Sequence, residues 1–262
     1  MPDTEDWEQM VEDAMKSVRY DPNLELADLR KTEAEVFDYP TMKTLSQLIN
    51  DDVIETLDFC ISTGKEANVF HGTAPDGTSL AVKIYRVNTT TFRQHLEYLW
   101  GDRRFDPGGK SERDVISLWA SKEFRNLRRL RNGNLRVPEP VAVENNIIVM
   151  EYIGEDERVA PLLKDVDLAE PRDGYDALVD FIETAWEEAD LVHGDLSAYN
   201  VLVHPPHLIV IDVAQAIVSD HPRARELLKR DVENVAKHFR SRGVDPDPDA
   251  VVDRLVPAEE VA

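Results

Sequence analysis

The chain has 262 residues, of which 52 are acidic and 30 are basic, so its formal net charge is −22 at pH 7. No run of about 18 apolar residues occurs, which excludes a transmembrane helix. The single cysteine excludes an internal disulfide and a cysteine-rich zinc site. The excess of acid argues against general nucleic-acid binding, so we expect no sequence-specific DNA binding.

The same charge predicts a halophilic protein, because molar salt screens the self-repulsion of so many carboxylates. The alternative is an acidic protein of an ordinary cell. The acidic first residues lack the basic and apolar regions of a signal peptide, so we expect a cytoplasmic location and no membrane partner.

Residues 1–52 are polar and predicted to form a helical extension, with apolar residues at helical spacing over 6–19 and a second helix over 41–50. After it the pattern changes to strands. Five strands are predicted in the first half, at residues 53–62, 68–73, 79–87, 137–143 and 147–153. A mixed-charge loop over 88–111 and a long helix over 111–131 separate the third strand from the fourth.

The second half alternates helices with short strands. Helices are predicted over 174–189 and 220–241, and strands over 201–203 and 208–213. The acidic tail after Gly243 contains three prolines and is expected to fray.

These elements predict an α+β chain with two lobes. The predicted parts are an N-terminal helical extension over 1–52, a strand-rich lobe over 53–153 with a flexible loop at 88–111, a helical lobe over 154–243 and a tail over 244–262.

The strongest chemical signal is Asp195, followed five residues later by Asn200 and twelve residues after that by Asp212, which ends an apolar strand. Phosphoryl transfer needs such a set. One carboxylate orients the accepting hydroxyl, while an amide oxygen and a second carboxylate hold Mg²⁺ on the nucleotide phosphates. We therefore predict Asp195 and Asp212 as catalytic residues, and Asn200 and Asp212 as metal ligands. The alternative is that Asp195 caps a turn and Asp212 merely ends a strand. His193 is predicted to fix a turn by hydrogen bonding.

Lys83 lies inside the apolar strand over 79–87, where a half-buried lysine needs a partner. Glu123 supplies one, because it falls on the apolar stripe of the helix over 111–131 and an acid there answers a buried cation. The pair would bind the α- and β-phosphates of ATP, as in protein kinases. The alternative is a surface lysine and a glutamate at the helix edge.

Two further segments are predicted to bind the nucleotide. The turn after the first strand can cover phosphates with backbone N–H groups, although it matches neither G-x-G-x-x-G nor the Walker pattern. Its predicted contact residues are Ser62, Thr63, Gly64, Lys65, Glu66, Ala67 and Val69. The connector after the last predicted strand of the first half is expected to bind adenine through Met150, Glu151 and Ile153.

Three motifs stand in order: Ser-Thr-Gly-Lys-Glu-Ala-Asn-Val at 62–69, His-Gly-Asp-Leu-Ser-Ala-Tyr-Asn at 193–200 and Ile-Asp-Val-Ala-Gln at 211–215. With them the chain resembles the RIO family of atypical protein kinases, in particular its first subfamily, over residues 36–240. The resemblance also includes the stretches 119–127, 221–222 and 231–235.

The resemblance implies a two-lobed protein-kinase-like fold and an archaeal serine/threonine kinase that uses ATP and Mg²⁺. It assigns Asp195 as the catalytic carboxylate, Asn200 and Asp212 as metal ligands, and Lys83 as the phosphate-binding lysine. It further implies ATPase activity, with Asp212 able to accept phosphate, and a role in late maturation of the small ribosomal subunit, whose precursor would be the partner.

Two other functions stay open. Aminoglycoside and choline kinases share His-Gly-Asp-Leu and a later asparagine, which leaves a small-molecule kinase as one alternative, although they lack Ser-Thr-Gly-Lys-Glu-Ala. A pseudokinase scaffold would bind nucleotide without turnover, and the intact set of Lys83, Asp195, Asn200 and Asp212 argues against it.

The loop over 88–111 carries further predictions. Ser111 is the leading autophosphorylation site, because a tethered loop presents its hydroxyls at high effective concentration. Ser117 is a weaker candidate, and the threonines at 89–91 are alternatives at the other end of the loop. The alternative is that Ser111 is a helix N-cap, with Asp114 three residues on. Trp100 is expected either to dock a partner or to anchor local packing. A basic contact surface is predicted from Arg103, Arg104 and Lys110.

Overall fold

The computed structural model describes residues 36–87, 96, 98–106, 108–155 and 158–256. The predicted helix over 6–19 lies outside these residues. The described chain divides into two compact units. Of the described residues, the first unit takes 36–87, 108–124 and 140–152, and the second takes 96, 98–106, 125–139, 153–155 and 158–256.

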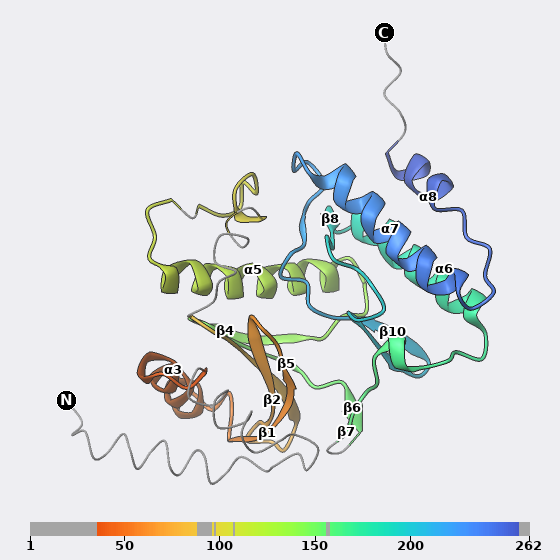
Figure 1. The fold of residues 1–262 in the computed structure, drawn as a ribbon. Helices are drawn as coiled ribbons and strands as arrows, with labels where there is room; N and C mark the ends of the chain where they lie inside the picture. The colour runs from red at the N-terminus through yellow and green to blue at the C-terminus, as the bar shows by residue number, and fades with distance from the viewer. Residues whose placement is uncertain (1–35, 88–95, 97, 107, 156–157, 257–262) are drawn as a thin grey trace, which may run out of the picture. The chain divides into compact units, whose positions relative to one another are not determined.

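The first unit is built on an antiparallel sheet of five strands in the order β1-β2-β3-β5-β4 (Figure 1). The strands are β1 (Thr56–Thr63), β2 (Ala67–Thr73), β3 (Ser79–Tyr85), β4 (Pro140–Glu144) and β5 (Ile147–Glu151). Gly77, with a φ of 85°, and the carboxylate of Asp76, which accepts a hydrogen bond from Thr78 N at 2.9 Å, close the β2–β3 hairpin. All five strands predicted for the first half are therefore present.

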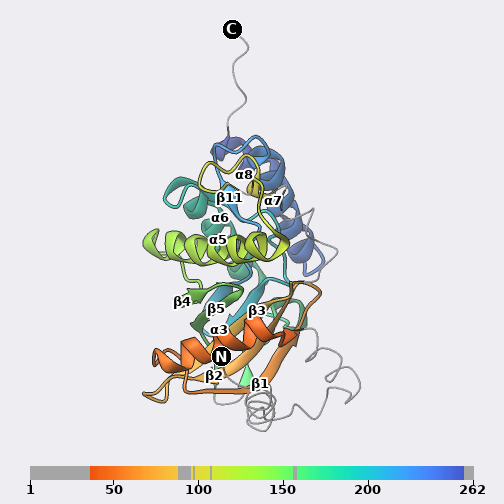
Figure 2. The same cartoon turned by 90° about the vertical axis from the view of Figure 1, so that its left-hand side faces the viewer.

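Helix α3 (Tyr39–Asn50) covers one face of this sheet (Figure 2). It begins where the Asp38 carboxylate accepts a hydrogen bond from Thr41 N at 3.0 Å, which satisfies one of the free amides of the first turn. The buried side chain of Asn146 donates to Thr41 Oγ1 at 3.0 Å and to the carbonyl of Tyr85 at 2.8 Å. These bonds join the helix to the β4–β5 turn and the end of β3.

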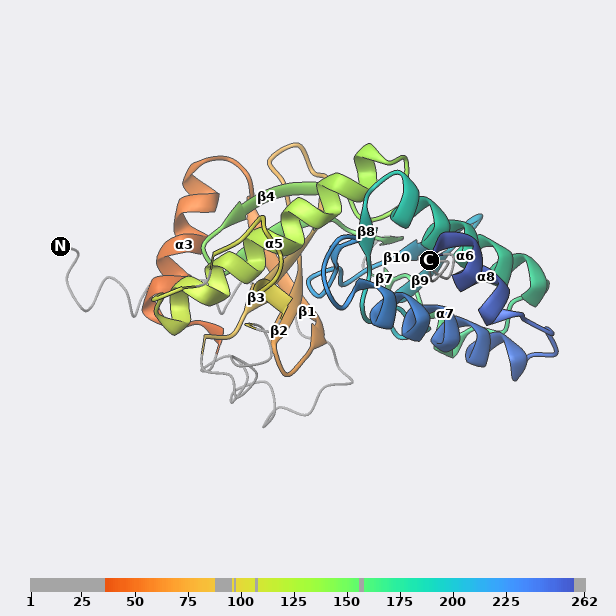
Figure 3. The same cartoon turned by 90° about the horizontal axis from the view of Figure 1, so that it is seen from above.

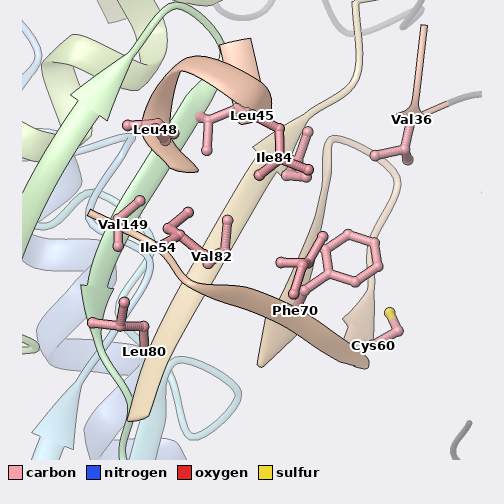
Figure 4. Packing of buried hydrophobic residues seen from close by; sticks show 12 residues of the cluster. Val36, Leu45, Leu48, Ile54, Cys60, Phe70, Leu80, Val82, Ile84 and Val149 are labelled. Carbon is pink, nitrogen blue, oxygen red and sulfur yellow. The ribbon is translucent and has the colours of Figure 1, made fainter. Parts of the chain in front are cut away.

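The core under α3 is aliphatic. Leu45 and Leu48 of the helix pack against alternate residues of the strands, among them Val82 and Val149 (Figure 4). Each fully buried side chain of this kind stabilises the fold by about 1.5–3 kcal/mol. Because side chains alternate along a strand, filling this core with Val82 turns Lys83 to the opposite face of the sheet.

Helix α5 (Glu112–Asn132) begins at a reciprocal cap. The Ser111 hydroxyl donates to the Asp114 carboxylate at 2.7 Å, and Asp114 N donates back to Ser111 Oγ at 3.3 Å. The N-cap interpretation of Ser111 is thus confirmed. The helix belongs to the first unit up to Phe124 and to the second unit from Arg125.

The second unit is mainly helical. Helices α6 (Pro171–Glu187) and α7 (Ala224–Arg240) lie side by side (Figure 3). Between them the rings of Tyr175 and Phe239 meet edge to face, with their centroids 6.0 Å apart. Short pieces complete the unit: β6 (Gly154–Glu155), β7 (Arg158–Val159), the 3₁₀ helix η1 (Leu163–Asp165), β8 (Leu191–Val192), β9 (Val201–His204), β10 (His207–Val210) and β11 (Ile217–Val218). Strand β8 pairs with β11 and β9 with β10, all antiparallel.

The predicted fraying of the tail is wrong for its first part, because helix α8 (Pro248–Leu255) forms there and packs on α7. Asp247 caps this helix by accepting from Ala250 N at 3.1 Å, and Pro248 suits its first turn. Val251 and Val252 are buried, and this small apolar face holds the helix in place. None of the described helices is long and apolar enough to span a membrane.

Candidate active site

The loop that carries Asp195 runs from β8 to β9, and His193 ties it to a second loop. The buried His193 ring accepts at Nδ1 from Asp195 N at 3.2 Å, so its Nε2 carries the proton and donates to the carbonyl of Ile211 at 3.2 Å. Both contacts are to the backbone. The prediction that His193 fixes a turn is confirmed.

Helix α7 supports the same loop from a second side. The Asp231 carboxylate, 1% exposed, accepts from Gly194 N at 2.7 Å and from Leu196 N at 2.9 Å, the two amides that flank Asp195. Asn234, one turn on, donates to the carbonyl of Leu196 at 3.1 Å. Burial raises the pKa of Asp231 to about 6, against the opposing effects of His193 and the two amides.

No role was assigned to Asp231 from the sequence, although a signal exists. It stands on the apolar stripe of α7 with Leu227, Leu228 and Val235, where an acid must find donors. The helical periodicity identifies the stripe, but the amides that meet the carboxylate lie 35 and 37 residues away in the chain.

Asp195 itself is half-buried, and this burial raises its pKa. His193, Arg230 and the hydrogen bond from Asn200 act in the opposite direction, while the Asp212 charge adds to the rise. Within the part of the chain that the structure describes, no hydrogen-bond partner meets the buried Nε and Nη2 atoms of Arg230. A cation with unused donors therefore lies within electrostatic range of Asp195.

Asn200 and Asp212 come together at one end of the β9–β10 hairpin. Val201 pairs with Val210, and Ile211 N donates to the carbonyl of Asn200 at 2.9 Å, which carries the chain to Asp212. The Asn200 side chain donates from Nδ2 to the carbonyl of Asp195 at 2.8 Å. Its Oδ1 is therefore turned away from that carbonyl.

Asp212 is exposed and has a φ of 58°, in the left-handed region that non-glycine residues seldom adopt. Such backbone persists only where the surroundings hold it, and it is concentrated at functional sites. Among the described residues no group of three or more His, Cys, Asp or Glu side chains could hold a metal ion. An amide oxygen and one carboxylate suit Mg²⁺ nevertheless, since this ion keeps several waters and takes few protein ligands.

In the first unit the predicted ion pair is present. Lys83 Nζ donates to Glu123 Oε1 at 2.8 Å, and both residues are buried. Tyr85, two residues along β3, donates its hydroxyl to Glu123 Oε2, and the Lys83 ammonium lies 5.1 Å from the centre of the Tyr85 ring. Tyr85 was not foreseen, although its place two residues after Lys83 puts it on the same face of the strand. The phosphate-binding role of the pair stays a prediction.

The predicted nucleotide loop is the tight β1–β2 turn. Gly64 N donates to the carbonyl of Ala67 at 2.9 Å, and a Cβ on Gly64 would lie 2.8 Å from that oxygen, so no larger residue fits without a shift. Val69 pairs in register with Lys83 and shares its face of the sheet. The residues before the turn's end are exposed, namely Ser62, Thr63, Gly64 and Lys65. Their roles, with those of Glu66, Ala67 and Val69, stay predictions.

The predicted connector is divided between the units. Met150 is buried and Glu151 half-buried at the end of β5, while Ile153 packs in the second unit with Leu202 and Ile209. The carbonyl of Ile153 accepts from Ala160 N at 3.0 Å. Adenine binding at these residues stays a prediction.

The predicted basic surface is wrong for Arg104, whereas Lys110 is exposed. Arg104 donates from Nε and Nη2 to the two oxygens of the buried Asp102 carboxylate, so these donors are not available to a partner. Arg103 is exposed but pairs with Asp220 at 3.0 Å. Trp100 is 63% exposed, which favours the docking alternative over the local packing anchor.

Comparisons with known proteins identify the family. A family model described as the RIO domain matches residues 68–251. The chain is 42% identical over 225 residues to the RIO-type serine/threonine-protein kinase Rio1 of Haloferax volcanii, a match that covers 86% of this chain and 77% of that protein. It is 38% identical over 219 residues to the human serine/threonine-protein kinase RIO1, which covers 82% of this chain but only 39% of the human protein.

The fold is similar to that of the Rio2 kinase of Chaetomium thermophilum. The structure of its ADP/Mg²⁺-phosphoaspartate complex matches with a TM-score of 0.63 at 22% identity, over 83% of this chain and 67% of that one. A second structure of the same kinase covers 98% of this chain with a TM-score of 0.64 at 21% identity. The predicted α+β kinase fold is thereby confirmed. Because the family model matches most of the chain and the Haloferax relative is 42% identical over 225 residues, the chain belongs to the RIO family of serine/threonine protein kinases.

Proposed function

We propose that this protein is an ATP- and Mg²⁺-dependent serine/threonine kinase that also hydrolyses ATP, and that it acts on the precursor of the small ribosomal subunit. The observation that carries the chemistry is the placement of Asn200 and Asp212 at one end of the β9–β10 hairpin, with the Asn200 side chain donating to the backbone carbonyl of Asp195 at 2.8 Å.

Asp195 is the base in this proposal. Its carboxylate accepts a hydrogen bond from a serine or threonine hydroxyl and takes the proton as that oxygen attacks the γ-phosphorus, with ADP leaving. The bonds from Gly194 N and Leu196 N to Asp231 hold the backbone on both sides of Asp195. These bonds hold the base in position before substrate binds.

Asn200 Oδ1 and the Asp212 carboxylate would hold Mg²⁺, which neutralises charge on the nucleotide phosphates when bound. Lys83 of the first unit is oriented by Glu123, and its positive charge would bind the nucleotide phosphates. Arg230 is a further candidate for contact with a transferred phosphoryl group, because its buried donors are unused among the described residues and it lies within electrostatic range of Asp195.

Hydrolysis would follow a second route through Asp212, whose exposed carboxylate can accept the phosphoryl group from ATP as ADP leaves and then transfer it to water. The Chaetomium Rio2 relative was solved as an ADP/Mg²⁺-phosphoaspartate complex, which supports such an intermediate in the family. The ribosomal partner rests on the family resemblance alone.

One set of assays tests the proposal. Release of ADP and transfer of ³²P from [γ-³²P]ATP are measured with and without small ribosomal subunits, at molar KCl. We expect Mg²⁺-dependent turnover that subunits stimulate. Asp180→Asn, on the exposed side of α6, is the matched control for substitutions of site aspartates. Turnover only with choline or an aminoglycoside would favour a small-molecule kinase, and nucleotide binding without turnover would favour a pseudokinase.

A further inference from the structure

A buried ion pair fixes the segment that precedes α5. Asp102 is 1% exposed, and Arg104 binds both of its carboxylate oxygens, from Nε at 2.9 Å and from Nη2 at 2.7 Å. A carboxylate so buried needs its charge compensated, and the two-pronged geometry of arginine supplies this. The pair belongs to the second unit, as do all the residues that it contacts below.

The remaining guanidinium nitrogen of Arg104 reaches a second buried residue. Nη1 donates to Asn126 Oδ1 at 2.9 Å, and the Asn126 side chain is completely buried on α5. Asn126 Nδ2 donates in turn to the carbonyls of Val213 at 2.8 Å and Ala216 at 3.0 Å. The amide orientation is fixed by these partners, since a flipped amide would set its oxygen against two carbonyls and its nitrogen against a cation.

The two carbonyls belong to the turn directly after Asp212, which Ala216 N closes by donating to the carbonyl of Val213 at 3.1 Å. Asp212 itself has the left-handed φ of 58°. Backbone of this kind persists only where neighbouring structure determines it. The Asn126 side chain binds this turn at two carbonyls, and Arg104 orients Asn126.

A second contact fixes the same segment near Trp100. His221 accepts at Nδ1 from Arg223 N at 3.1 Å, so its Nε2 carries the proton and donates to the carbonyl of Trp100 at 3.1 Å. Gly101 follows with a φ of 92°, and a Cβ there would lie 2.7 Å from His221 Nε2. The segment over 98–106 is thus held at two points to chain that follows Asp212.

We propose that Arg104 is a positioning residue for Asp212: through Asn126 it holds the turn over 213–216 and so sets the carboxylate that would bind Mg²⁺. The inference rests on the metal-binding role given to Asp212 under the proposed function. The segment over 98–106 would then contribute to metal affinity, although none of its residues would contact the metal.

Arg104→Lys is the test variant. It keeps a positive charge opposite Asp102 but cannot bind both carboxylate oxygens and Asn126 together. Arg103→Lys is the matched control, because this neighbouring arginine makes only an exposed pair with Asp220 among the contacts that the structure gives it. Substitution of residues that orient metal ligands lowers metal affinity by roughly 10- to 100-fold. We expect a shift of this size in the Mg²⁺ midpoint for ADP binding in Arg104→Lys, with metal-free ADP affinity unchanged, and none in Arg103→Lys.

Hydrogen exchange gives a readout that needs no metal. Loss of the Asn126 anchor is expected to speed amide exchange in peptides covering 213–218 by roughly five- to tenfold, with peptides of α6 unchanged. If Arg104→Lys does not fold, the double variant Asp102→Asn/Arg104→Gln, which buries no charge, takes its place. Wild-type exchange over 213–218 together with a wild-type Mg²⁺ midpoint would overturn the inference. A wild-type protein that binds ADP without regard to Mg²⁺ would overturn the metal role of Asp212 instead, whereas faster exchange in Arg104→Lys would still support the anchor.

Discussion

Asp231→Asn separates the charge of the buried carboxylate from its shape. Asp231 accepts two backbone hydrogen bonds, at 2.7 and 2.9 Å, and its pKa is raised from the ordinary 3.8 to about 6 because burial disfavours its charged form. That rise of about two pKa units corresponds to ~3 kcal/mol at 1.36 kcal/mol per unit.

The sign follows from proton binding. Between pH 4 and 6 the folded protein holds a proton on Asp231 that the unfolded chain has released, so the stability from this group falls as pH rises through that window. Asparagine does not titrate. The unfolding free energy of the wild type minus that of Asp231→Asn should therefore fall by roughly 2–3 kcal/mol from pH 4 to pH 7. The lost second acceptor adds a roughly constant offset of about 1–3 kcal/mol in favour of the wild type.

Urea unfolding at fixed molar KCl, followed by tryptophan fluorescence at several pH values, measures this difference. Comparing two variants cancels the titration of the other carboxylates that they share. Asp180→Asn, at an exposed aspartate on α6, is the control for an Asp-to-Asn change outside the site. A flat difference for Asp231→Asn, or one that rises with pH, would refute the reasoning from burial.

Three further outcomes are expected. Lys83→Met should lower the free energy of unfolding in urea by about 3–5 kcal/mol, because it leaves Glu123 charged and buried. Adding Glu123→Leu should recover most of that loss, and a single variant as stable as the double one would contradict this. Ser111→Ala should lower the free energy of unfolding by about 1 kcal/mol through loss of the α5 cap. It should also remove ³²P from the peptide containing residue 111 after incubation with ATP and Mg²⁺, and wild-type label found only in other peptides would exclude Ser111 as the site. Thermal midpoints should rise from low to molar KCl because of the net charge of −22, and a flat or falling series would defeat the halophilic interpretation.

The pairs that local periodicity determines were predictable from the sequence. Lys83 sits in a strand whose alternate residues fill the core, and Glu123 sits on an apolar helical stripe, so each needed the other. Asn200 and Asp212 flank a two-strand hairpin, which brings them together once the strands pair.

The contacts that no local pattern encodes were missed. Asn126 and Val213 are 87 residues apart, and nothing in the loop over 88–111 marks Arg104 as internal and Arg103 as exposed. The left-handed backbone at Asp212 has no sequence signal either, because aspartate occurs in every backbone region. Helix α8 was missed because its apolar face is only three residues, Val251, Val252 and Leu255, in an otherwise acidic tail.

The most direct test of the account is a single-turnover measurement of phosphoryl transfer by Asp195→Asn. ADP binding in the presence of Mg²⁺ is measured on the same sample, with Asp180→Asn as the control. We expect nucleotide affinity close to that of the wild type and transfer slower by about 10²–10⁴-fold, because the variant keeps the fold of the loop but loses the base. Transfer at the wild-type rate by Asp195→Asn would contradict the central claim.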